Sequence, residues 1–143
     1  MLKTTRRHTL KLMSAGALAA TGTGFFAGIA HAEGKRIAMV VKNLGNSYFD
    51  ACSNGAMEAA KEVGGFEIIY TAPTKATAEE QIAVIDALIA QKVDGIIVSS
   101  NDADALIPVG KKAMDRGIKV ISFDSAIGEG GRIMHLDASS TPL

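Results

Sequence analysis

Residues 37–50, with the sequence IAMVVKNLGNSYFD, place a continuous apolar run directly before a polar loop. The run at 37–41 has no charge and no polar alternation, which is typical of a strand buried on both faces of a sheet. The loop carries a cation, amides and aromatic rings, and a helical pattern begins inside it. This order predicts the first β–loop–α unit of an open parallel α/β sheet, in which small molecules bind outside the carboxyl ends of the strands.

The alternation of strand and helix patterns continues along the rest of the chain. Apolar runs predict strands at residues 35–41, 66–70, 96–99, 119–123 and 132–136. Apolar residues spaced by three and four predict helices at 47–63, 77–91 and 103–116. Strands that alternate with helices form a parallel sheet with helices on both faces and right-handed crossovers. The predicted fold class is therefore α/β, flavodoxin-like or Rossmann-like.

With the strand order 2-1-3-4-5, the carboxyl ends of the first, third and fourth strands lie side by side. Three loops then converge on one edge of the sheet. Charged, amide and hydroxyl groups pair well with sugar hydroxyls, and aromatic rings cover the C–H face of a sugar. We therefore predict a neutral polyhydroxyl ligand. Its candidate binding residues are Lys42, Asn46, Tyr48, Phe49, Asn101, Asp102, Asp124 and Ser125.

Several of these residues also have a purely structural interpretation. The alternative for Lys42 is a solvated loop lysine that contacts no ligand. Of Tyr48 and Phe49, one is expected in the core. Asn46 and Asp102 each precede a predicted helix, so each suits an N-cap. Asp124 is the strongest candidate, because it directly ends an apolar strand at the edge of the proposed site.

Other classes of function find little support in the residues. The chain has no Gly-x-Gly-x-x-Gly and no Walker loop, so the usual phosphate cradles are missing. Neither a catalytic triad nor a metal-binding spacing is present, and we predict a protein that is not an enzyme and needs no cofactor. Residues 1–32 hold four of the 15 basic residues and no acid, which leaves 11 basic against 15 acidic residues afterwards. That balance argues against a nucleic-acid partner.

The first 32 residues have the layout of a secretory signal. A basic start is followed by an uncharged apolar stretch at 12–29 and by Ala-His-Ala at 30–32. We predict cleavage between Ala32 and Glu33, with an uncleaved membrane anchor as the alternative. The stretch TRRHTLK at residues 5–11 resembles the twin-arginine export signal of bacteria. The expected destination is the periplasm.

Residues 35–140 resemble the periplasmic sugar-binding proteins of bacterial ABC importers, of the ribose-binding type. The resemblance rests on three segments, IAMVVKNLGNSYFDACSNGAMEAAKE, YTAPTKATAEEQIAVIDALIAQ and VDGIIVSSNDADALIPVGKKAMDRGIKVISFDS. The chain looks closest to the rhamnose-binding and autoinducer-2-binding branch. That likeness implies ligand contacts for Lys42 and Asp124, and it aligns the family's first-loop amide and aromatic positions with Asn46, Tyr48 and Phe49.

Members of this family carry a second lobe that closes over the ligand. The sequence has no counterpart of it, so we expect residues 33–143 to be the N-terminal lobe of a longer sugar-binding protein, with weak affinity on its own. The resemblance implies a sugar ligand such as rhamnose, delivery to an ABC permease in the inner membrane, and a monomer when complete. The alternative is an exported flavodoxin-like enzyme or cofactor-binding protein. A sugar-responsive repressor would need a DNA-binding segment that residues 1–32 do not resemble.

Overall fold

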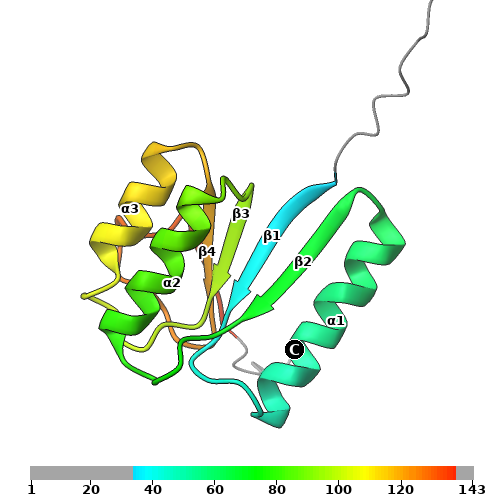
Figure 1. The fold of residues 1–143 in the computed structure, drawn as a ribbon, viewed down its shortest axis with the longest axis horizontal. Helices are drawn as coiled ribbons and strands as arrows, with labels where there is room; N and C mark the ends of the chain where they lie inside the picture. The colour runs from blue at the N-terminus through cyan, green and yellow to red at the C-terminus, as the bar shows by residue number, and fades with distance from the viewer. Residues whose placement is uncertain (1–33, 138–143) are drawn as a thin grey trace, which may run out of the picture.

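A computed structural model describes residues 34–137 of the chain. These residues form a five-stranded parallel sheet with three helices (Figure 1). The strands are β1 (Lys35–Val40), β2 (Phe66–Thr71), β3 (Gly95–Val98), β4 (Lys119–Phe123) and β5 (Met134–Leu136). The helices are α1 (Ser47–Val63), α2 (Ala78–Ala90) and α3 (Ile107–Asp115). The predicted signal with its cleavage point at Ala32 and Glu33 lies outside the described residues.

The strand order is β2-β1-β3-β4-β5, and every neighbouring pair runs parallel, as the sequence predicted. The α/β fold class with helices on both faces is also confirmed: α2 and α3 lie on one side of the sheet and α1 on the other (Figure 1). Because successive strand residues point to opposite faces, Ala38 and Val40 pack toward α2 and α3, whereas Met39 and Val41 pack toward α1.

The two faces are covered to different extents. The α2/α3 face holds a large core that draws on both helices and on three strands. The α1 face holds a smaller cluster around Met39, Val41, Phe49 and Phe123. Their spacing by three and four puts the apolar residues of α1 on one face of the helix, but Val63 at its end is 73% exposed. The face they share is only partly covered by the described residues.

Helix α3 begins later than predicted, at Ile107 instead of residue 103. Residues 103–106 form turns because their backbone groups are used elsewhere. The Asp102 carboxylate accepts the N–H groups of Asp104 and Ala105 at 3.0 and 2.9 Å, and the Ala103 carbonyl accepts the N–H of Gly128. Pro108 then occupies the first helical turn, where its missing N–H costs nothing.

Candidate functional site

The candidate site centres on a charged pair that links the ends of β1 and β4. Lys42 Nζ lies 3.3 Å from Asp124 Oδ2, and about a third of each side chain, 32%, is exposed. The ammonium also donates to Ser125 Oγ at 2.5 Å, and Ser125 Oγ lies 3.3 Å from the same carboxylate oxygen. Ser99, at the end of β3, donates to Asp124 Oδ2 at 2.7 Å. The carboxyl ends of three strands therefore meet in one hydrogen-bonded cluster, as the predicted strand order required.

The backbone and the electrostatics of Asp124 are both unusual. Its φ of 57° lies in the left-handed region that non-glycine residues seldom adopt, and such strain is concentrated at functional sites. Partial burial by itself raises the pKa of Asp124. The hydrogen bonds from Ser99 and Lys42, together with the charge of Lys42, outweigh that effect and hold the pKa below its ordinary value. Asp124 is thus a carboxylate at neutral pH, ready to accept hydrogen bonds from hydroxyl groups.

In the first loop, the structure separates residues that the sequence had grouped. Asn46 caps α1, since its Oδ1 accepts the N–H of Tyr48 at 3.0 Å. Tyr48 is 42% exposed at the rim, where burial raises the pKa of its phenol. Phe49 is only 3% exposed and packs edge-on against Phe123, with ring centroids 6.1 Å apart. The structure therefore places Phe49 in the core, in contact with the ring of Tyr48. A ligand contact by Phe49 stays a prediction.

In the loop after β3, Asn101 and Asp102 lie differently. Asn101 is partly buried, and its backbone N–H donates to the side chain of Gln81 at 2.8 Å. The exposed Asp102 carboxylate accepts backbone N–H groups of the turn before α3. The N-cap of α3 is Leu106, so the expectation that Asp102 caps the helix was wrong, because the helix begins four residues later than predicted. A ligand contact by Asp102 would compete with those bonds.

Two residues of this edge were not among the predicted binding residues. Ser99 donates a hydrogen bond to Asp124, and it ends the strand predicted at residues 96–99, one of the three whose ends converge on the site. Gln81 is a polar side chain that is fully buried in α2. Its position four residues before Ile85 and seven before Leu88 puts it in the buried stripe of the helix. A polar residue in an apolar stripe was the signal that could have identified it.

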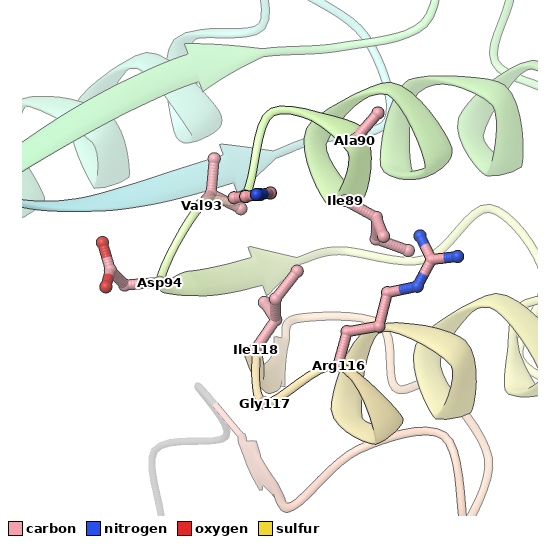
Figure 2. Close-up of a pocket in the computed structure, with 8 residues that line it drawn as sticks. Ile89, Ala90, Val93, Asp94, Arg116, Gly117 and Ile118 are labelled. Carbon is pink, nitrogen blue, oxygen red and sulfur yellow. The ribbon is translucent and has the colours of Figure 1, made fainter.

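A hollow of about 330 Å³ adjoins the charged pair on the α1 side of the sheet, and Tyr48 and Asp124 line it together with Cys52 and Phe123. A larger cavity, of about 580 Å³, lies at the opposite edge, where β3 and β4 begin (Figure 2). Ile89, Val93, Ile118 and Arg116 are among the residues that line it, and the lining contains none of the predicted binding residues. The hollow beside Asp124 is therefore the one that belongs to the candidate site.

Residues 34–137 contain neither a metal-binding cluster nor a membrane-spanning helix. Within this range no group of three or more His, Cys, Asp or Glu side chains is placed to hold a metal ion. None of its helices has the length and apolarity needed to cross a membrane.

Comparisons with known proteins identify the family to which this architecture belongs. Residues 37–141 match the family described as periplasmic binding protein domain. The D-ribose/D-allose-binding protein of Pseudomonas aeruginosa is 36% identical over 95 residues, which are 65% of this chain and 30% of that protein.

Solved structures agree. An ABC transporter solute-binding protein from Clostridium phytofermentas with bound L-rhamnose is 36% identical and has a TM-score of 0.68. The aligned part covers 73% of this chain and 32% of that protein. LsrB from Clostridium saccharobutylicum, in complex with AI-2, is 27% identical with a TM-score of 0.68, over 71% of this chain and 31% of its own. The chain thus spans about a third of the length of the relatives it matches. Since the family match extends over most of the folded part, the chain belongs to the periplasmic binding protein family.

Proposed function

We propose that residues 33–143 form the N-terminal lobe of a periplasmic sugar-binding protein and supply one wall of its sugar cleft. The observation that carries the proposal is the cluster of Lys42, Ser99, Asp124 and Ser125 at the carboxyl edge of the sheet. It presents an ammonium and two hydroxyls, each within 3.3 Å of the same carboxylate oxygen, Asp124 Oδ2. Sugar hydroxyls both donate and accept, so they can bridge such groups without needing a formal charge.

The ligand we propose is a small polyol such as rhamnose or autoinducer-2. The relatives bound to L-rhamnose and to AI-2 motivate this choice, as does the rim position of Tyr48, whose ring would cover the apolar face of a sugar. Lys42, Asp124, Ser125 and Asn101 would make the polar contacts. In this proposal, Asn46 and Phe49 support Tyr48, and Asp102 shapes the loop after β3.

The remaining parts of the proposal concern the route and the partner. Residues 1–32 would direct export, through a twin-arginine-like signal cleaved between Ala32 and Glu33. The mature chain would work in the periplasm as a binding protein, not an enzyme, and would pass its sugar to an ABC permease as part of a longer monomeric protein. Edman sequencing of the exported product would test the cleavage point, and a first residue other than Glu33 would contradict it.

Titration of the isotope-labelled 143-residue chain with L-rhamnose, D-ribose, D-allose and AI-2 tests the binding site by NMR. One lobe buries only part of a ligand, so we expect millimolar affinity, which corresponds to about 4 kcal/mol. The amide signals of Lys42, Asn101 and Asp124 should move, whereas those of the α2/α3 core should not. No response to any of the four compounds would remove the proposed ligand class.

A matched pair of variants shows whether Asp124 is a contact. Loss of a charge that is hydrogen-bonded to the ligand and covered by it costs about 2–5 kcal/mol of binding free energy, so Asp124→Ala should abolish the response. Asp86→Ala removes a carboxylate that pairs with Lys112 on the outer surface of the helices, and it should leave the response intact. An unchanged titration with Asp124→Ala would exclude Asp124 from the site. A yellow purified protein with flavin absorbance would instead favour the cofactor-binding alternative.

A further inference from the structure

Gln81 is a fully buried polar side chain that makes contact with two of the converging segments of the site. It is 0% exposed and lies in the first turn of α2, facing the sheet. Its Nε2 donates to the carbonyl of Ser99 at 2.9 Å and reaches the carbonyl of Val41 at 3.5 Å. Its Oε1 accepts the backbone N–H of Asn101 at 2.8 Å. The amide thus pairs at both ends, which satisfies a polar group that would otherwise be costly to bury.

These contacts occur where the strands β1 and β3 separate. Their last paired residues are Val40 and Val98, and the last backbone bond runs from Ser99 N to Val40 O at 3.0 Å. Beyond that point the two chains leave toward different loops, one through Lys42 and the other through Asn101. The side chain of Gln81 continues the pairing beyond the end of the ladder, since it binds a carbonyl from each strand.

We propose that Gln81 is a positioning residue for the ligand site. It holds the backbone of Asn101 directly. It also holds Ser99 by the carbonyl while the Ser99 hydroxyl donates to Asp124 at 2.7 Å, so the carboxylate is fixed through Ser99. This inference rests on the proposed function, and it adds a residue that touches no ligand but sets the positions of two groups that would.

The chemistry of the site calls for an amide at this position. Glutamine offers donors and an acceptor on one flat group, as the two carbonyls and the N–H require. A carboxylate would turn an acceptor toward two carbonyl oxygens, and burial would raise its pKa. Methionine has a similar length but would leave three backbone groups without this partner. Removing one side of a buried hydrogen bond costs more than the bond itself contributes, because the remaining partner stays desolvated.

The test compares Gln81→Met and Gln81→Glu with Gln91→Met, which makes the same change at an exposed position at the end of α2. Three readouts are taken on the full 143-residue chain: amide hydrogen exchange, the carboxyl ¹³C titration of Asp124, and the sugar titration. In Gln81→Met we expect exchange at Asn101 to rise about tenfold or more, and sugar affinity to fall about tenfold. The pKa of Asp124 should move up toward its ordinary value. Gln91→Met should behave like the wild type.

A merely structural role would give a different result. A general loss of stability raises exchange throughout the core, including at Ile96, whereas the proposed role confines the change to Asn101, Ser99 and Asp124. Gln81→Glu adds a pH signature. Its carboxyl should have a raised pKa, so the defect at pH 7 should shrink as the pH falls toward 5 and the group becomes protonated and able to donate. Asp124 remains ionised over that window because its own pKa lies below the ordinary value.

The outcomes separate the two proposals. If the wild-type chain responds to no sugar, the proposed function is wrong, even if Gln81 fixes the positions of Ser99 and Asn101. Unchanged Asn101 exchange and an unchanged Asp124 pKa in Gln81→Met overturn the inference about Gln81, whatever the chain binds. Sugar affinity within twofold of the wild type in Gln81→Met, on a chain that binds sugar, overturns it as well.

Discussion

The two faces of the sheet differ in how completely they are covered. Among residues 34–137, 14 buried apolar residues form one core on the α2/α3 side, whereas the α1 side has four, so most of the packing energy of this part lies on one side. On the α1 side an apolar groove of about 270 Å³ runs beside Ala56, Val63, Phe66 and Ile97. The number of helices explains the difference, since two helices pack on the first face and one on the second (Figure 1).

The candidate site lies where these unequal faces meet. Gln81 and Asn101 belong to the well-packed side, and their hydrogen bonds hold the end of β3. Tyr48 and the hollow beside Asp124 belong to the open side. One half of the site is therefore preorganised by a closed core, while the other half leaves room for a ligand or for more protein.

The largest expected effect comes from two adjacent residues of β3 that have the same chemistry. Ile96 is 1% exposed and points into the α2/α3 core, whereas Ile97 is half-buried on the α1 side. Ile96→Ala should lower the free energy of unfolding by about 2–5 kcal/mol, because it opens a cavity in a closed core. Ile97→Ala should cost about 1 kcal/mol, since only part of its apolar area is buried.

Urea unfolding followed by circular dichroism measures both variants. Equal losses would show that the two faces are packed alike.

A smaller effect is expected at the helix caps, one on each face. Asn46 accepts the Tyr48 N–H at 3.0 Å, and Thr77 accepts the Glu80 N–H at 3.4 Å. Asn46→Ala should cost about 1 kcal/mol of stability, and Thr77→Ala about 0.5 kcal/mol, because the longer bond is weaker. Thermal unfolding by calorimetry gives both values. A larger loss for Thr77→Ala would mean that α2 depends on its cap more than the geometry indicates.

The smallest effect on stability is expected at Val63, on the exposed end of α1. Val63→Lys should change the free energy of unfolding by less than about 0.5 kcal/mol, since little is buried there. The same change should reduce self-association, because it interrupts an exposed apolar groove. Sedimentation velocity measures the association, with Ala83→Lys on the exposed side of α2 as the matched control. Equal effects of the two lysines would show that charge alone, and not the groove, is responsible.

Much of the fold and part of the site were predictable because their signals are local. Apolar runs, glycines after helices and the capping residues Asn46 and Thr77 all act within a few residues of chain, and the predicted order of strands was confirmed. Lys42 and Asp124 could be chosen because each follows the end of an apolar strand. The late start of α3 was not predictable in this way, since the carbonyl of Ala103 is taken by Gly128, which lies 25 residues further along the chain.

By itself, the sequence determined the order of the elements, the loops that carry polar groups and the family to which the chain belongs. The tertiary structure alone decided that Phe49 lies in the core, and that Ile96 is buried whereas Ile97 is half-buried. It also decided that Gln81 binds the ends of two strands. The physical reason is that strand and helix patterns depend on neighbours in the chain. Burial and hydrogen-bond partners depend instead on which distant segments pack against a residue, and on how many of them there are.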